Sequence, residues 1–197
     1  MYRPNKNVAR GEATRSQLIA VATRLFADRG YEETSIEAVL RAAGVSRGSL
    51  YHHFASKEAL FEAVAEDVET SVGVQTLAAA DGIADPVAAL RAGFLAWIRL
   101  AGDPVVRRIL LIDAPSVLGW ERWRSMEEDH SLGLIRVVLQ AIAEQGRLRP
   151  DLVDTLAHVL LASGNEVALL VARSDDSEAA MQAGADAIDE LLRRLFS

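Results

Sequence analysis

Apolar side chains recur every three to four residues along almost the whole chain, and this helical period constrains the fold more than any other feature of the sequence. No stretch alternates convincingly between apolar and polar side chains, as a half-buried strand would, and no internal repeat is visible. Asp-Pro pairs at Asp85-Pro86 and Asp103-Pro104 are typical helix starts, with Asp as the N-cap and proline in the first turn. We therefore predict an all-α fold of about nine helices.

Composition limits the class of protein further. Half of the 197 residues are hydrophobic, which suits one large globular domain or two small ones. Cysteine is absent, so disulfides, thiol catalysis and thiolate zinc sites are excluded. The longest clean apolar run, Val167–Ala172, is far shorter than the roughly 20 residues of a membrane helix, and the polar start Met1–Asn7 predicts no secretory signal. We expect a cytoplasmic protein with no membrane partner.

Two helix starts are predicted in the first 40 residues. Thr14 and Gln17 have the spacing of a capping box, and the helix that follows ends at Gly30. A second capping box, at Thr34 and Glu37, predicts the next helix. Each helix has apolar side chains at helical spacing on one face.

A third and a fourth helix follow closely. Gly44 can adopt a left-handed conformation and end the second helix, and Ser46 is the N-cap of a helix barely two turns long. Leu50 and Phe54 form the inward face of that short helix, and Ser56 caps a longer one. Helices this short bury little apolar area alone, so we expect them to pack on one another as a small bundle.

The rest of the chain predicts a larger bundle. Its longer helices are expected near residues 85–101, 104–112, 119–144, 150–173 and 176–196. The Ala-rich stretch near residue 80 is interpreted as a loop or a frayed helix end, and Pro115 as part of a break between helices.

Charge is unevenly distributed between these two parts. Residues 1–57 contain nine Lys and Arg against five Asp and Glu, a net charge of +4. The remaining residues contain 12 basic and 23 acidic side chains, a net charge of −11. A basic segment on an acidic remainder suggests that the first segment meets a polyanion, although chance clustering over so short a stretch is the alternative.

The short helix after Ser46 carries an unusual set of exposed groups: Arg47, Ser49, Tyr51, His52 and His53. A helix fits the major groove of DNA, where an Arg near its N-terminus can donate two hydrogen bonds to guanine. Gly48 has no side chain, so a base or a backbone can approach closely there. The alternative is that Tyr51 and Phe54 are core residues and the histidines are merely exposed. We accept that alternative for Phe54 only.

This stretch closely resembles the DNA-binding signature of the TetR family of bacterial transcriptional regulators. The resemblance covers about residues 12–60, and beyond them it depends mainly on helix content and length. The matching features are Phe26 to Gly30, Tyr31, Thr34, Gly44-Val45-Ser46, Leu50-Tyr51-His52-His53-Phe54 and Ser56-Lys57-Glu58.

The resemblance implies a role for each matching position. Arg47 and Gly48 occupy positions where family members touch base edges, with Ser49 and His52 expected to join them. Six further residues occupy positions where members bind phosphates: Thr34, Ser35, Ser46, Tyr51, His53 and Lys57. The expected division is a helix-turn-helix domain over residues 1–57 and a helical regulatory domain over 58–197.

The resemblance also implies partners. TetR-like proteins dimerise through their last two long helices, here about residues 150–196, and a dimer would bind a pseudo-palindromic operator in double-stranded DNA. The small residues of the first of these helices would allow close helix packing, but both helices must also pack on their own core. The expected function is a sequence-specific DNA-binding transcriptional regulator, a repressor that a small-molecule effector releases from its operator. The sequence defines neither the operator nor the effector.

Many family members enclose a ligand between their middle helices, and this chain offers candidates for such a pocket. Two tryptophans three residues apart suggest an apolar wall with a few polar anchors nearby. The candidate residues for a small apolar or amphipathic ligand are Phe94, Trp97, Trp120, Trp123, Met126, His130, His158 and Asn165. Ordinary core packing of the tryptophans is an equally good interpretation.

Two other classes of protein are alternatives, an enzyme and a helical adaptor. Glu127 and His130 have the Glu-x-x-His spacing of di-iron bundles, but no second copy exists, and no nucleotide-binding glycine loop or Gly-x-Ser-x-Gly turn is present. We therefore predict no enzyme activity, no metal and no cofactor. A helical adaptor that has lost DNA binding is the other class, and the polar set around Arg47 argues against it.

Overall fold

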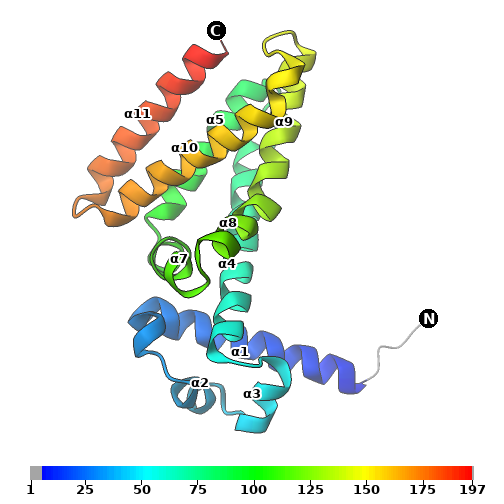
Figure 1. Ribbon diagram of the computed structural model, residues 1–197, viewed down its shortest axis with the longest axis vertical. Helices are drawn as coiled ribbons and strands as arrows, with labels where there is room; N and C mark the ends of the chain where they lie inside the picture. Colours follow the sequence, from blue (N-terminus) through cyan, green and yellow to red (C-terminus); the bar gives the residue numbers. More distant parts are fainter. Residues whose placement is uncertain (1–5, 197) are drawn as a thin grey trace.

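The computed structural model describes residues 6–196, with side chains from Arg10 onward. Met1–Asn5 lie outside the described residues. They include Arg3 of the basic segment and most of the polar start that predicts no secretory signal. Figure 1 shows α1, α2 and α3 grouped at one end and a taller helical bundle above them. We call α1–α3 the head and α5–α11 the body, and α4 passes from one to the other. Residues 6–196 contain helices and no strand, which confirms the all-α prediction.

The head contains α1 (Lys6–Glu33), α2 (Ile36–Ala43) and α3 (Arg47–His53). The helix α1 begins at Lys6, so the prediction that a capping box at Thr14 opens it is wrong. The Thr14 hydroxyl lies within the helix and donates to the Arg10 carbonyl at 3.0 Å. Gln17 donates its side-chain amide to the Ala43 carbonyl at 2.8 Å, so it ties α1 to the end of α2.

Gly30 interrupts the end of α1, as predicted. Its φ of 81° lies in the left-handed region that favours glycine. A Cβ atom at this position would also lie 1.8 Å from Nη2 of Arg108, so glycine permits a close approach between the head and the body. The next helix, α2, is capped by Ser35, whose Oγ accepts from the Ala38 N–H at 3.1 Å. The predicted capping box at Thr34 was therefore one residue too early.

The helix α4 (Lys57–Ala80) belongs to the cores of both groups. Its first turns place Phe61 in edge-to-face contact with Phe26 of α1, at 5.2 Å between ring centroids, and both side chains are fully buried. Its later turns pack along α5. The helix continues through the Ala-rich stretch and ends at Ala80, because alanine has the highest helix propensity. Of the two interpretations of this stretch, the loop is wrong and the helix end applies.

The body follows the predicted segments closely. Its elements are α5 (Pro86–Ala101), α6 (Pro104–Val106), η1 (Arg107–Asp113), α7 (Ala114–Val117), α8 (Trp120–Glu127), η2 (Glu128–Leu132), α9 (Gly133–Glu144), η3 (Pro150–Leu152), α10 (Val153–Arg173) and α11 (Ser177–Leu195). Asp85 and Asp103 cap α5 and α6 as predicted. The predicted break at Pro115 lies instead at Gly119, where φ is 79°, because Pro115 occupies the first turn of α7 and needs no N–H there.

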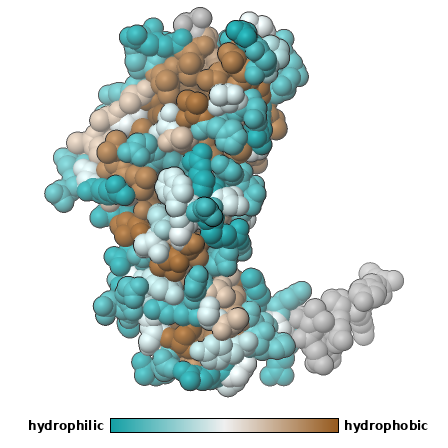
Figure 2. Space-filling view, viewed as in Figure 1, coloured by the Kyte–Doolittle hydropathy of each residue, from teal (hydrophilic) through white to brown (hydrophobic). Residues whose placement is uncertain are grey.

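The last two helices, α10 and α11, have one face in the body and one face in solvent. Gly164, Ala168 and Ala172, three of the small residues of α10, are buried, and α10 packs on α5, α9 and α11 of the same chain. Part of the set of small residues on α10 therefore belongs to the core. Val159 and Leu170 of α10 remain 47% and 60% exposed. Figure 2 shows a band of apolar residues across the upper part of this face, where α10 and α11 lie.

One segment among residues 6–196, Pro150–Arg173, is long and apolar enough to cross a membrane by length and composition. In the fold it packs against α5, α9 and α11. Core helices of soluble proteins satisfy the same length and composition test.

Candidate nucleic-acid interface and ligand pocket

The orientation of α3 follows from its caps and its buried residues. Gly44 ends α2 with φ of 66°, and Ser46 caps α3 by accepting the Ser49 N–H at 3.2 Å. Leu50 is fully buried and Phe54 is 4% exposed. With these two side chains packed on the head, the opposite face of α3 must point into solvent.

That solvent face carries most of the residues assigned to bases. Arg47, Gly48 and His52 are exposed, and Ser49 is partly exposed. A Cβ atom added to Gly48 would meet no atom within 4 Å, so the surface there is open to a close partner. The face of α3 that carries these residues is therefore open to solvent.

Arg47 is paired within the head. Its guanidinium forms an ion pair with Glu37 of α2 and lies over the Tyr51 ring at 5.9 Å from the centroid. Both charged side chains are more than half exposed. Exposed pairs contribute little, on the order of 0–1 kcal/mol, so a nucleic acid can compete for this guanidinium.

Apart from Thr34, the residues assigned to phosphates lie on α3 itself, at the N-caps of α2 and α3, or at the first residue of α4. Ser35 and Ser46 are exposed N-caps whose oxygens accept backbone N–H groups, which leaves each hydroxyl proton free to be donated. Tyr51 is 44% exposed, and His53 is partly buried with its ring 5.1 Å from that of His52. The ammonium of Lys57 lies 4.0 Å from the centre of the Tyr31 ring and donates to the Glu32 carbonyl at 3.4 Å.

Thr34 does not belong to this surface, and its predicted contact with phosphate is corrected. The residue is fully buried. Its hydroxyl lies 2.8 Å from the Gly30 carbonyl and 3.1 Å from the Leu25 carbonyl, so its single proton is used inside the head. Thr34 instead fixes the turn between α1 and α2.

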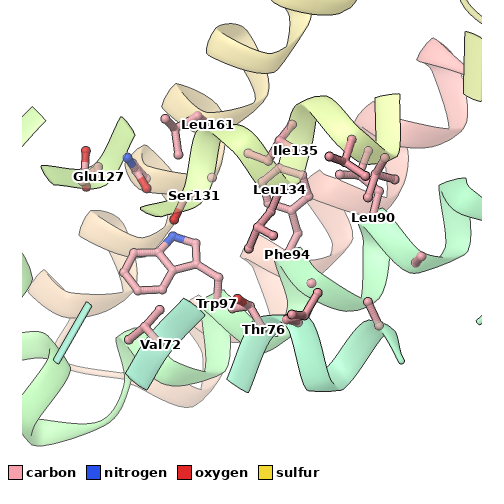
Figure 3. Close-up of a pocket in the computed structure, with 18 of the residues that line it drawn as sticks. Val72, Thr76, Leu90, Phe94, Trp97, Glu127, Ser131, Leu134, Ile135 and Leu161 are labelled. Atoms are coloured by element: carbon pink, nitrogen blue, oxygen red, sulfur yellow. The ribbon is translucent and has the colours of Figure 1, made fainter. Parts of the chain in front are cut away.

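A pocket of about 170 Å³ lies within the body (Figure 3). Helices α4, α5, α8, α9 and α10 and the segment η2 all contribute to its wall. The lining residues that the close-up labels are Val72, Thr76, Leu90, Phe94, Trp97, Glu127, Ser131, Leu134, Ile135 and Leu161. The wall is mostly apolar, and Glu127 and Ser131 lie toward one end of it in Figure 3.

The structure brings together only part of the predicted ligand set. Phe94, Trp97 and Asn165 line the pocket. The other five predicted residues lie outside its lining: Trp120, Trp123, Met126, His130 and His158.

Each of these five has another environment. Trp120 is 63% exposed, whereas Trp123 and Met126 are core residues. The Nδ1 atom of His130 lies 2.9 Å from the Met126 carbonyl, and Nδ1 of His158 lies 3.9 Å from the Glu128 carboxylate. Core packing, the alternative kept open for the tryptophans, therefore applies to Trp123.

Two acidic residues that the sequence analysis did not assign to the ligand also line the pocket. Glu69 and Glu127 are each 4% exposed. Burial raises the pKa of Glu69 to about 7, against the opposing effects of His130 and of a hydrogen bond from Ser131. Burial, followed by the charge of Glu69, raises the pKa of Glu127 to about 8, against the opposing charge of Arg124.

A signal for Glu69 was present in the sequence. It lies four residues after Ala65 and three before Val72, both of them buried residues of α4, so helical spacing alone places an acid on an apolar face. No group of three potential metal ligands occurs within the described part of the chain.

The head and the body meet at a buried carboxylate. Asp113, 7% exposed, accepts the Tyr31 N–H at 2.8 Å and the Arg108 Nε–H at 3.2 Å. Tyr31 follows Gly30 at the end of α1, and Asp113 ends the segment η1. The head and the body are therefore linked both by α4 and by this hydrogen-bonded joint.

Two family models match the chain. Residues 18–64 match the family described as "Bacterial regulatory proteins, tetR family". Residues 87–195, more than half of the chain, match "Tetracyclin repressor-like, C-terminal domain". The first match includes all of α2 and α3, and the second includes nearly all of the body.

Relatives and solved structures agree with these matches. The HTH-type transcriptional repressor KstR2 of Mycobacterium tuberculosis is 28% identical over 141 residues, 70% of each chain. The HTH-type transcriptional repressor AcnR of Corynebacterium efficiens is 26% identical over 148 residues, 75% of this chain and 76% of its own. A crystal structure of a TetR-family transcriptional regulator from Pectobacterium atrosepticum has a TM-score of 0.84 at 30% identity, covering 95% of this chain and 96% of that one. The complex of RolR with resorcinol, at 22% identity, covers 96% of each chain with a TM-score of 0.73 and shows the fold alone.

A helix-turn-helix with an open polar face, joined to an all-helical body, defines a DNA-binding transcriptional regulator. The family model across the body and the similarity at 30% identity then specify which kind. The chain belongs to the TetR family of bacterial regulators, which confirms the resemblance found in the sequence.

Proposed function

We propose that this protein is a homodimeric repressor that binds a pseudo-palindromic operator through α3 and leaves it when a small molecule fills the body pocket. The observation that carries the proposal is the solvent face of α3, where Arg47, Gly48 and His52 stand opposite the buried Leu50 and Phe54. The relatives KstR2 and AcnR are named repressors, which supports repression over activation.

In this proposal α3 lies in the major groove. Arg47 leaves Glu37 and donates to a guanine, with Gly48, Ser49 and His52 facing neighbouring bases. Ser35, Ser46, Tyr51, His53 and Lys57 bind the flanking phosphates. Thr34 has no part in the contact, because its hydroxyl is used inside the head.

The second copy is proposed to pack on α10 and α11. Val159, Ala162 and Leu170 lie on the exposed side of α10, and Ala183 and Ala187 lie on the exposed side of α11. Paired across a two-fold axis, these stripes would form a four-helix interface. The two heads would then enter successive major grooves about 34–36 Å apart.

The ligand step needs a route from the pocket to the head. Helix α4 supplies Glu69 and Val72 to the pocket wall and Phe61 to the head core, so a shift of α4 moves both ends. A ligand that binds more tightly to one separation of the heads would change operator affinity by population shift, without any chemical step. The resorcinol named with RolR supports a small-molecule ligand in a body of this fold.

We assign the DNA-binding domain to residues 1–57 and the regulatory domain to 58–197, with α4 as the shared helix. Nothing in this mechanism requires catalysis, a metal or a cofactor, and we place the protein in the cytoplasm with its DNA. The adaptor alternative predicts no salt-sensitive binding to DNA.

The test is binding of the purified full chain to DNA from just upstream of its own gene. Fluorescence anisotropy measures this binding across a salt series. We expect saturable binding that resists competitor DNA and weakens steeply with salt. Arg47→Ala is the variant that should lose this binding, and Glu121→Gln, an exposed change on α8, is the control. If no sequence selected from random DNA binds specifically, the proposal is wrong.

A further inference from the structure

Three polar atoms in the pocket wall have no hydrogen-bond partner within the described residues. They are Nε1 of Trp97 on α5, Oε2 of Glu127 on α8 and Nδ2 of Asn165 on α10. Glu127 and Asn165 are 4% and 7% exposed. Buried polar atoms are normally paired, so three unpaired atoms around one cavity indicate a missing partner.

Two of the three residues, Trp97 and Glu127, lie toward one end of the pocket in Figure 3. In Figure 3 the indole nitrogen of Trp97 points toward Ser131, on the side of Glu127, whereas Leu90, Phe94 and Leu134 lie toward the other end. A ligand that fits this wall therefore has one polar end and one apolar end.

The donor and acceptor properties of the three atoms define the polar end. The indole N–H of Trp97 and the amide NH₂ of Asn165 can only donate, so they need an acceptor. With its pKa raised to about 8, Glu127 is mostly a neutral carboxylic acid at neutral pH and can both donate and accept. Such a set of donors and acceptors suits a hydroxyl or carbonyl oxygen on the ligand.

Charge disfavours the other common head groups. The lining contains Glu69 and Glu127 but no Lys, Arg or His, so a carboxylate ligand would meet acids without a counter-charge. An ammonium ligand would pair with an ionised Glu127 but leave both N–H donors without an acceptor. Outside the lining, the charge of His130 lowers the pKa of Glu69, and the charge of Arg124 lowers the pKa of Glu127. Glu128, also outside the lining, forms an ion pair with Arg124 and lies near His158.

The size of the pocket limits the apolar end. An apolar cavity of about 150 Å³ can hold benzene, and this pocket, which is partly open to solvent, has a volume of about 170 Å³. Phe94 and Trp97 offer aromatic faces to a ring. Leu77, Leu134 and Val137 line the pocket and are also exposed, so a longer substituent can leave between them.

We propose that the pocket binds an uncharged ring compound through a hydroxyl or carbonyl oxygen, which accepts from Trp97 and Asn165. A hydroxyl would also donate to Glu127, and a carbonyl would accept from the Glu127 carboxylic acid. The inference rests on the proposed function, since it names the class of ligand for the same pocket.

The test measures binding of four probes to the full chain, without DNA, by calorimetry and ligand-observed NMR at neutral pH. The probes are phenol, its near-isostere toluene, benzylammonium and benzoate. We expect phenol to bind most tightly and benzoate not to bind. Trp97→Phe removes the N–H and keeps a ring, so it should weaken phenol about fivefold and leave toluene unchanged. Trp120→Phe, outside the lining, is the matched control and should change neither.

Glu127→Gln separates a neutral ligand from a cation, because Gln still donates and accepts but cannot ionise. We expect phenol binding to stay within about threefold of the unmodified protein. The proposal is overturned if benzylammonium binds best and Glu127→Gln abolishes it, if toluene equals phenol, or if no probe binds. The ranking on the unmodified chain decides the matter even where a variant fails to fold. Operator binding is measured separately, so its failure would refute the proposed function instead.

Discussion

Replacing Glu127 by Gln should reduce an unusual dependence of stability on pH. The pKa of this carboxyl is about 8 in the folded protein against an ordinary value of 4.5. The folded state therefore holds a proton that the unfolded chain releases. The carboxyl does not oppose folding below about pH 4.5, and it destabilises the fold progressively as the pH rises toward 8.

The magnitude follows from the difference between the two pKa values. A difference of about 3.5 units corresponds to at most about 5 kcal/mol of lost free energy of unfolding, reached above the folded pKa. About 2–3 kcal/mol of this loss falls between pH 5 and 7, and about 1 kcal/mol more between pH 7 and 9. Glu69 acts in the same direction and remains in the variant, so only the difference between the two proteins reports on Glu127.

The assay is urea unfolding followed by circular dichroism at several pH values from about 5 to 9, on the unmodified protein, Glu127→Gln and Glu121→Gln. We expect the difference in free energy of unfolding between Glu127→Gln and the unmodified protein to grow by about 4 kcal/mol from about pH 5 to pH 9, in favour of the variant. Glu121→Gln, on the exposed face of the same helix, should follow the unmodified protein. Parallel pH profiles for Glu127→Gln and the unmodified protein would refute the argument that burial raises the pKa of this carboxyl.

Three further substitutions test the interface and the joint. Arg47→Ala should weaken operator binding by about 1–3 kcal/mol per half-site and relax base preference at one position, measured by anisotropy on operator variants; unchanged specificity would contradict the assignment of α3. Lys57→Ala should weaken all DNA sequences similarly and reduce the slope of log K against log salt, and an unchanged slope would exclude a phosphate contact. Asp113→Ala should lower the free energy of unfolding by about 2 kcal/mol, because the Tyr31 N–H loses its acceptor, while the partly exposed Arg108 adds little; urea midpoints equal to those of the unmodified protein would contradict a structural joint.

The head could be predicted from the sequence because short-range rules control it. Gly44, Ser46, Leu50 and Phe54 each act within one or two helical turns, so their conformation or burial follows from spacing and side-chain chemistry. The same rules misplaced Thr34, since nothing in its local sequence shows that its hydroxyl turns back to the Gly30 and Leu25 carbonyls.

The pocket could be predicted only in part, because its wall depends on which helix faces converge. Trp120 and Trp123 are neighbours with ring centroids 4.9 Å apart, yet one lies in solvent and the other in the core. Their position depends on the turn at Gly119, which fixes how α8 leaves α7. Glu69 and Glu127 are 58 positions apart in the chain, and only the packing of α4 against the segment after α8 brings both to one cavity.

The three polar atoms of the pocket without a partner among the described residues also suggest how a small ligand can change the affinity for an operator. A hundredfold loss of operator affinity requires about 2.7 kcal/mol of difference between the ligand's affinities for the two states. Apolar contacts alone change little when helices slide by a fraction of a turn, because they have no direction. Hydrogen bonds to Trp97, Glu127 and Asn165 depend on geometry, at about 1 kcal/mol each, and come from three different helices. A ligand held by all three would therefore favour one arrangement of those helices by about the required amount, and α4, which packs on α5 and on α1, would transmit it to the head.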